Sequence, residues 1–281
     1  MLGAIYGDIA GSMYEPGTDY WYNRNIPNNF KIFGAYCHFT DDTLMTLAVA
    51  DALVASKNDM GNYRTNLICS MRRIAHEYPN VAWGASFKKW LFDMGDDPLP
   101  INSFGNGAAM RISPVGWVCD TLEETVELSK QTTKVSHNHP EGIKGAEAVA
   151  VAIYLARTGA SKDEIKKKAI EYYPEIEGMT IAGLVSSNYG DPETNGWITC
   201  QGSVPQAICA FLESDSLESA VRNAITLNAD ADTQAAIAGS IAEAFYGFNY
   251  ADEDKVFEYL PEDLQSICHA FRIIKKKRVA K

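Results

Sequence analysis

Apolar residues recur at three- and four-residue intervals along most of the chain, which is the spacing of amphipathic helices. Alternation of apolar and polar residues, as in a half-buried strand, is hard to find. Gly, Pro and Asn are concentrated between the periodic stretches and indicate loops there. The stretches with helical spacing are 1–15, 42–56, 66–78, 121–135, 142–158, 161–173, 204–214, 216–227 and 232–247. The pattern predicts an all-α protein with roughly ten or more helices.

The chain shows no internal repeat, no low-complexity tract and no linker long enough to separate two domains. We therefore expect one compact multi-helix domain over residues 1–281. A short basic segment, about 272–281, ends the chain and holds six of its 25 Lys and Arg residues. We interpret this segment as a solvated helix end or tail.

Composition limits the classes of function. The hydrophobic content of 46% in 281 residues is that of a folded protein with a sizeable core. A net charge of −11 argues against a general nucleic-acid binder, because such a protein needs a basic face to replace counterions. The longest apolar run, 148–156, is far shorter than the ~20 residues that span a bilayer, so no membrane partner is expected.

The N-terminal stretch and the cysteines both favour a cytoplasmic protein. The first basic residue is Arg24, and Asp8 interrupts the preceding apolar stretch, so the pattern of a secretory signal is not present. The six cysteines are widely and irregularly spaced, without a CxxC pair. We interpret them as reduced, mostly buried thiols, and neither as a zinc site nor as a disulfide framework.

Three glycines at a spacing of four residues mark one face of the first helix. Gly3, Gly7 and Gly11 share this face, and Glu15 is the next residue along it. Each glycine costs roughly 1 kcal/mol relative to alanine inside a helix. Tight packing against a neighbouring helix would offset this cost and would carry Glu15 into the interior. The alternative is that Glu15 is an exposed carboxylate at a helix end.

Clustered oxygen-bearing side chains stand at two helix starts. The segments that carry them are "HFTDDT" at 38–43 and "NADADT" at 228–233. One interpretation is local, because a helix start favours a threonine cap and carboxylates in its first turn. The other is that the two clusters are ligands of a hard cation. The residues concerned are Thr40, Asp41, Asp42, Asp230, Asp232 and Thr233.

The spacing of the residues and the chemistry of their oxygens limit the kinds of cation site that the two clusters could form. A calcium loop would need an oxygen ligand at position 234 and a glycine at 235, where the chain has Gln234 and Ala235. A phosphatase loop of the D-x-D-x-[TV] type would need Thr or Val at 234. Four carboxylates and two hydroxyls suit Mg²⁺ or Mn²⁺ better than Zn²⁺. Without a cation, such a cluster would be strongly self-repelling.

Six segments, in this order, resemble the ADP-ribosylglycohydrolase family, which includes the dinitrogenase-reductase-activating glycohydrolases. They are "GAIYGDIAGSMYE", "FTDDTLMT", "GNGAAMRISPVG", "SHNHPEGIKGA", "GSVPQAICAF" and "DADTQAAIAGSIAEAFYG". The resemblance extends from Gly3 to about Gly247 and is specific because six motifs occur together. It implies a compact all-α fold, a centre of two Mg²⁺ or Mn²⁺ ions, and hydrolysis of the bond between ADP-ribose and an acceptor.

The resemblance also implies roles for individual residues. Glu15 and Asp232 would be the catalytic carboxylates, with Asp232 also bridging the two ions. His137 would contact the substrate, whereas His139 is given no role. The metal ligands would be Thr40, Asp41, Asp42, Asp230, Asp232 and Thr233. The loop around the diphosphate and ribose would consist of Ser103, Phe104, Gly105, Asn106 and Gly107.

The chain departs from the family pattern at four positions. Asn228 and Ala229 replace paired glycines, and Ala231 replaces the first threonine of the second ligand motif. Asn accepts positive φ better than most residues, so a turn at Asn228 is compatible with the change. Ser136 stands where the family prefers threonine. The ligand side chains are intact, so these changes concern the shape of the loop more than its metal.

The expected function is metal-dependent hydrolysis that releases ADP-ribose from a modified protein or small molecule. Glu15 would orient or deprotonate the attacking water. Arginine-linked ADP-ribose is the default acceptor linkage, with serine linkages, ADP-ribosylated nucleic acid and small ADP-ribosyl compounds left open. Two alternatives remain at this stage. One is a non-catalytic ADP-ribose-binding or structural relative, and the other is a phosphohydrolase that cleaves the diphosphate.

Overall fold

The computed structural model describes residues 1–23, 26, 30–191, 193 and 196–279. In this part of the chain the regular structure is helical, and the one β feature is an isolated bridge between Gly105 and Thr199. The α-helices are α1 (Leu2–Gly11), α2 (Asp19–Asn23), α3 (Asp41–Ala55), α4 (Tyr63–Glu77), α5 (Ala85–Phe92), α6 (Gly107–Met110), α7 (Ser113–Val118), α8 (Leu122–Lys134), α9 (Pro140–Arg157), α10 (Lys162–Tyr172), α11 (Ile181–Ser186), α12 (Cys200–Leu212), α13 (Leu217–Thr226), α14 (Ala231–Tyr246), α15 (Tyr250–Phe257) and α16 (Glu262–Val279). Four 3-10 helices complete them: η1 (Ser12–Tyr14), η2 (Met60–Asn62), η3 (Pro174–Gly178) and η4 (Gly196–Ile198). The prediction of a compact all-α domain is confirmed.

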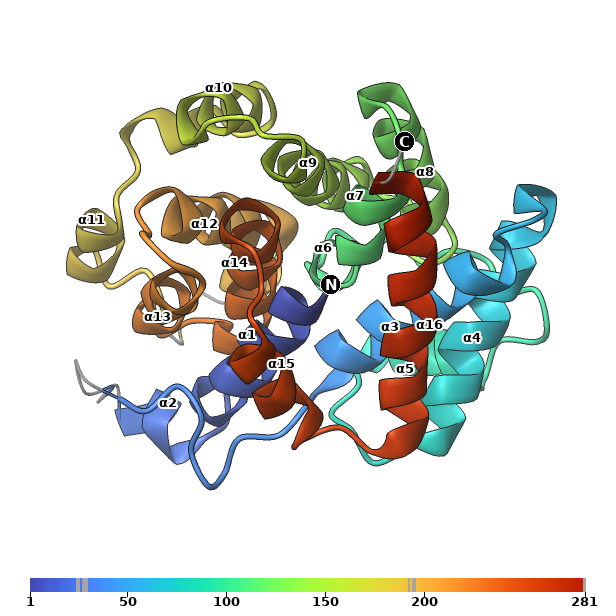
Figure 1. Cartoon of the computed structure of the whole chain (residues 1–281). Helices are drawn as coiled ribbons and strands as arrows, with labels where there is room; N and C mark the ends of the chain where they lie inside the picture. Colours follow the sequence, from blue (N-terminus) through green and yellow to red (C-terminus); the bar gives the residue numbers. More distant parts are fainter. Residues whose placement is uncertain (24–25, 27–29, 192, 194–195, 280–281) are drawn as a thin grey trace.

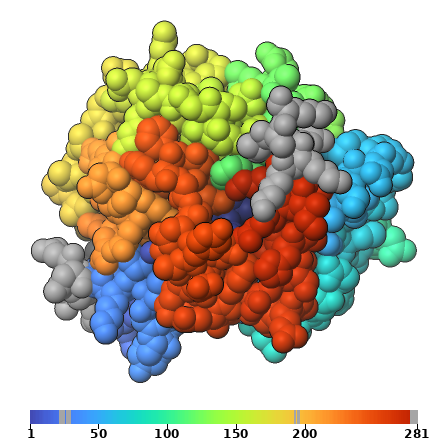
Figure 2. All heavy atoms as spheres, in the orientation of Figure 1, coloured from blue at the N-terminus to red at the C-terminus, as the bar shows by residue number. Residues whose placement is uncertain are grey.

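Helices α1 and α14 form the centre of the domain. Helix α14 packs along α1 and is flanked by α9, α12 and α13, while α3 packs between α1, α4 and α16 (Figure 1). The whole of α1 is buried, and the C-terminal helices cover most of it on the face shown in Figure 2. Within the described residues, no helix combines the length and apolar character needed to cross a bilayer.

The glycine face of α1 lies against the backbone of α14. A Cβ built on Gly11 would lie 2.5 Å from both the carbonyl oxygen of Ala231 and the Cα of Asp232. Gly3 and Gly7 are equally confined, by Gly239 and Ala235. Since side chains here would collide with backbone, only glycine permits this approach of the two helices. The expected tight packing of this face is therefore observed.

The N-terminal stretch differs from its prediction in one respect. Helix α1 ends at Gly11, and η1 follows as a tighter turn up to Tyr14. Glu15 comes after η1 in an extended conformation, with φ −68° and ψ 162°. Glu15 is therefore not the next residue on the glycine face. The loop that follows η1, and not helical phase, determines its position.

The basic segment at 272–281 continues α16 as far as Val279, and residues 280 and 281 lie outside the described part of the chain. Within the segment, Lys275 Nζ lies 3.3 Å from the buried carboxylate of Glu243 on α14. This lysine also lies over the ring of Trp117. These contacts attach the last helix to the centre of the domain.

Candidate metal and active site

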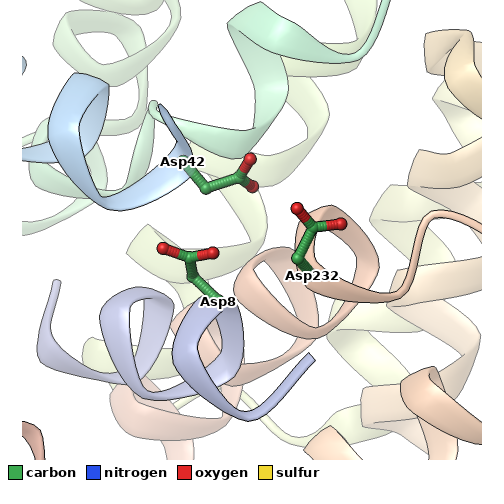
Figure 3. A group of neighbouring side chains, drawn as sticks. All are labelled: Asp8, Asp42 and Asp232. Atoms are coloured by element: carbon green, nitrogen blue, oxygen red, sulfur yellow. The ribbon is translucent and has the colours of Figure 1, made fainter. Parts of the chain in front are cut away.

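Three carboxylates from three helices meet at the centre of the domain. Asp8 on α1, Asp42 on α3 and Asp232 on α14 each place one oxygen within 4.8 Å of the others (Figure 3). Their exposed fractions are 0%, 2% and 4%. Burying three carboxylates together is strongly unfavourable unless hydrogen bonds or a cation offset their charge. The hydrogen bonds of each carboxylate therefore indicate whether it stabilises the fold or is free to bind a cation.

The Asp8 carboxylate accepts hydrogen bonds from the residues at the start of α3. Its Oδ2 accepts the backbone N–H groups of Thr40 (2.9 Å) and Thr43 (3.1 Å), and Thr43 also donates its hydroxyl to Oδ2. Its Oδ1 accepts the Thr40 hydroxyl at 2.7 Å. Thr40 is the N-cap residue of α3, and its Oγ1 also accepts the Asp42 N–H. Asp8 therefore satisfies N–H groups that the first turn of α3 cannot pair by itself.

Asp42 and Asp232 each have one carboxylate oxygen without a hydrogen-bond partner among the described residues. In both residues this oxygen is Oδ1, which is buried. The other Asp42 oxygen accepts the Thr233 hydroxyl at 3.3 Å, which connects α14 to α3. Buried carboxylate oxygens are rarely left unpaired, because their desolvation is not compensated. These two orphaned oxygens, in a site of oxygen donors, fit a hard divalent cation such as Mg²⁺ or Mn²⁺.

Burial, together with repulsion within the cluster, raises the pKa of its members. Burial, followed by the charges of Asp232 and Asp8, raises the pKa of Asp41 to about 8. The same causes raise the pKa of Asp42 well above its usual value. Burial also raises the pKa of Asp8 to about 6, although its threonine hydrogen bonds act in the opposite direction. The cluster is thus poised to exchange protons for a cation.

Glu15 faces this cluster from the end of η1. Burial, followed by the charge of Asp232, raises the pKa of Glu15 to about 10. Its side chain is 24% exposed, and its Oε1 lies 3.9 Å from Nε2 of the exposed His38. Glu15 therefore combines a shifted pKa with access to solvent, a combination typical of a general acid or base.

Asp230 connects the cluster to the predicted substrate loop. Asp230 precedes α14 at its N-cap position, but its side chain makes no capping bond there. Instead, its Oδ2 accepts a hydrogen bond from Nδ2 of Asn106, at 2.5 Å. Asn106 is 8% exposed, and its backbone N–H donates to the Ile198 carbonyl. The loop and the carboxylates are therefore parts of one site.

The remaining residues of this loop form a tight turn with an aromatic rim. Oγ of Ser103 accepts the Gly105 N–H at 3.1 Å. Phe104 is 46% exposed, and its ring centre lies 5.4 Å from that of His139. Gly107 begins α6. His139, for which no role is predicted, is the N-cap of α9 and accepts the Glu141 N–H through Nδ1.

His137 is buried behind Gly107. A Cβ built on Gly107 would lie 3.3 Å from His137 Nε2, so the ring edge faces the loop. Nδ1 of His137 lies 2.9 Å from Oγ of Ser136. Burial and the charge of Arg111 hold the pKa of His137 well below its usual value, so the ring is neutral near pH 7.

Three of the four departures from the family pattern lie beside the second ligand cluster. Asn228 has φ 52°, a left-handed conformation that asparagine tolerates better than most residues. Ala229 is fully buried in a small cluster with Trp21 and Trp197. Ala231 is also fully buried, and its carbonyl oxygen lies against Gly11. The turn before Asp230 is therefore compatible with the residues that this chain has.

The structure brings together Glu15, both ligand clusters and the 103–107 loop, and it adds one residue that the sequence reasoning missed. In the sequence, Asp8 appears only as an interruption of an apolar stretch. A carboxylate within an apolar helix that is lined with glycine was nevertheless a signal, because such a residue is buried and needs partners.

The chain belongs to the ADP-ribosylglycohydrolase family, whose model matches residues 1–276. Relatives include the ADP-ribosylhydrolase ARH3 of Homo sapiens, which is 25% identical over 96% of this chain and 88% of the relative. The ADP-ribosylarginine hydrolase Tri1 of Pseudomonas putida is 27% identical over 88% of this chain and 69% of that protein. A solved structure, described as an ADP-ribosylglycohydrolase-related protein complex, matches with a TM-score of 0.68. It is 20% identical and covers 98% of this chain and 97% of its own, a likeness that concerns the fold. Membership of the family supports a hydrolase acting on ADP-ribosyl groups.

Proposed function

We propose that this protein hydrolyses the glycosidic bond between ADP-ribose and an acceptor, with two Mg²⁺ or Mn²⁺ ions as cofactors. The observation that carries the proposal is the pair of orphaned oxygens on Asp42 and Asp232, in a buried cluster joined to the 103–107 loop. A non-catalytic relative would have no reason to keep this unfavourable group of carboxylates intact.

The ligands would be Asp42 and Asp232 with Thr40, Asp41, Asp230 and Thr233, while Asp8 holds the start of α3 beneath them. Divalent cations there would offset the repulsion among the carboxylates, lower the pKa of Glu15 and hold the ribose hydroxyls and a water in a fixed geometry. Because the Asp8 oxygens are largely engaged by α3, we assign Asp8 to positioning.

Glu15 would remove a proton from the water that attacks the anomeric carbon. The new carbon–oxygen bond would form as the bond to the acceptor breaks, and the proton taken up by Glu15 would be returned to the acceptor nitrogen or oxygen as it leaves. Positive charge develops on the sugar in such a transition state, and the surrounding carboxylates stabilise it. The 103–107 loop and His137 would hold the diphosphate and the adjoining ribose.

Arginine is the acceptor that we propose first. A guanidinium is cationic and suits a site whose side chains are mainly carboxylates. The P. putida relative is named an ADP-ribosylarginine hydrolase, which agrees with this choice.

Product analysis tests the proposal. The protein would be incubated with Mg²⁺ or Mn²⁺ and a panel of substrates carrying arginine-linked, serine-linked and nucleic-acid-linked ADP-ribose. Free ADP-ribose as the product, lost on chelation and in Asp232→Asn, supports the proposal. Release of AMP would indicate diphosphate cleavage. The absence of any product with every linkage would indicate a binding protein.

A further inference from the structure

A buried arginine next to the substrate loop is bonded to neutral oxygens. Arg111 is 0% exposed and follows α6 directly. Its Nη1 donates to the Gly107 carbonyl at 3.0 Å, its Nη2 donates to Ser136 Oγ at 2.6 Å, and its guanidinium lies 5.2 Å from the centre of the Phe87 ring. Burying a guanidinium costs free energy that these bonds offset only in part. An apolar residue of similar length would fill the same space at a lower desolvation cost. The hydrogen bonds of Arg111 therefore call for an explanation.

The direction of each hydrogen bond can be derived from the chemistry of the donors. Arginine has no acceptor, so Ser136 Oγ must accept from Arg111. The hydroxyl hydrogen of Ser136 then needs an acceptor, and Nδ1 of His137 lies 2.9 Å away. Ser136 is fully buried, so an unpaired hydroxyl hydrogen would be costly there.

This chain of bonds fixes the tautomer of His137. A neutral imidazole carries one hydrogen, and if Nδ1 accepts, the hydrogen must be on Nε2. The opposite tautomer would direct two hydrogens at each other between Ser136 and His137, or leave the serine hydrogen unpaired. Nε2 has no hydrogen-bond partner among the described residues and faces Gly107 at the end of the substrate loop.

We propose that Arg111 and Ser136 are positioning residues that hold His137 with its hydrogen on Nε2, so that the ring donates a hydrogen bond to an oxygen of bound ADP-ribose. The inference rests on the proposed function for the identity of the ligand. The glycine at 107 belongs to the same arrangement, because a side chain there would crowd Nε2.

The tautomer can be measured directly in the ligand-free protein. The two nitrogens of a neutral imidazole give well-separated ¹⁵N resonances, so long-range ¹H–¹⁵N spectra of ¹⁵N-histidine-labelled protein identify the protonated one. His137 is assigned by comparison with His137→Ala. We expect the Nε2–H tautomer in the wild-type protein and in Ser136→Thr, which keeps the hydroxyl. Ser136→Ala should lose this preference. A wild-type ring protonated on Nδ1 would overturn the proposal.

Binding and turnover provide the second readout. Ser136→Ala should weaken the affinity for free ADP-ribose about tenfold, the ratio expected for one lost hydrogen bond, and should raise KM while kcat stays nearly unchanged. Ser136→Thr should keep the wild-type affinity. In the His137→Ala background, Ser136→Ala should have no additional effect, because the two residues act through one bond.

Equal losses in Ser136→Ala and Ser136→Thr, or additive losses in the double variant, would contradict the proposal. The spectra need neither substrate nor catalysis. A protein that shows the expected tautomer but releases no ADP-ribose would therefore refute the proposed function and leave the assignment of the positioning residues standing.

Discussion

Replacing Gly11 by alanine tests whether the approach of α1 to α14 holds the carboxylates in place. Gly11 has φ −79° and ψ −26°, which alanine adopts readily, so the substitution introduces no backbone strain. Intrinsic helix propensity alone would make alanine more stable by about 1 kcal/mol. The new Cβ, however, would lie 2.5 Å from the Asp232 Cα, where 3.4 Å or more is ordinary contact.

The free-energy cost of this steric contact should exceed the gain in helix propensity. The colliding atoms belong to backbone that cannot rotate away, so the helices must separate by nearly 1 Å at this point. Overpacking of a core typically costs 1 to 3 kcal/mol, and we expect a value of about 3 kcal/mol for a backbone collision. The net loss of about 2 kcal/mol corresponds to a fall in Tm of roughly 3 to 4 °C. Asp232 moves with its helix, so the stabilisation by Mg²⁺ or Mn²⁺ should also decrease.

Thermal and chemical unfolding, with chelator and with each ion, measures both effects. Gly178→Ala is the matched control, because Gly178 is exposed and a Cβ there would meet no atom within 4 Å. The control should keep the wild-type stability within about 1 kcal/mol and keep the full response to ions. A Gly11→Ala protein as stable as the wild type, with an unchanged response to ions, would refute this account of the glycine face.

Three further predictions concern the site. Saturation with Mg²⁺ or Mn²⁺ at about one hundred times Kd should stabilise the wild-type protein by roughly 2.7 kcal/mol but leave Asp232→Asn nearly unaffected, as thermal scans with and without chelator will show. The ion-free protein should be more stable near pH 5 than near pH 8, because the folded-state pKa values of Asp41 and Asp42 are raised and the stability they contribute is lost as these groups ionise. Urea unfolding at the two pH values checks this, and a rise in stability with pH in chelator would contradict it. Glu15→Gln should retain its affinity for free ADP-ribose and lose at least ~10²-fold in turnover, measured by calorimetry beside a product assay. If binding and turnover fell together, Glu15 would hold the metal or the structure instead.

The sequence predicted most of the long helices, because each has a local signal, although α16 was not predicted. Helices α3 and α14 begin at Asp41 and Ala231, within one residue of the predicted stretches at 42–56 and 232–247. Periodicity over a dozen residues defines such helices, and oxygen-bearing side chains mark their first turns. Short helices such as α6 and α7 have too few residues to show a period, so they were not predicted.

Parts of the site that depend on distant contacts were not predictable. Asp8 is 32 residues from Thr40, to which it is bonded, and Asn106 is 124 residues from Asp230. Neither pairing has a spacing that can be recognised in one sequence. The position of Glu15 depends on the end of α1 at Gly11, where a tighter turn replaces the helix. Helix boundaries are set partly by tertiary contacts, so the glycine spacing alone could not determine it.

The wide separation of the carboxylates along the chain has a consequence for biosynthesis. Asp42 and Thr233, which share a hydrogen bond in the cluster, are 191 residues apart. At a synthesis rate of about 5 to 20 residues per second, roughly 10 to 40 s pass between the translation of the first ligand cluster and that of the second. During this interval α1 and α3 have no α14 to pack against. A nascent chain therefore cannot complete the cluster, and chaperones would meet an N-terminal segment whose glycine face is still uncovered. Loading with metal is thus expected to follow translation, which makes ion uptake a natural marker of the finished fold.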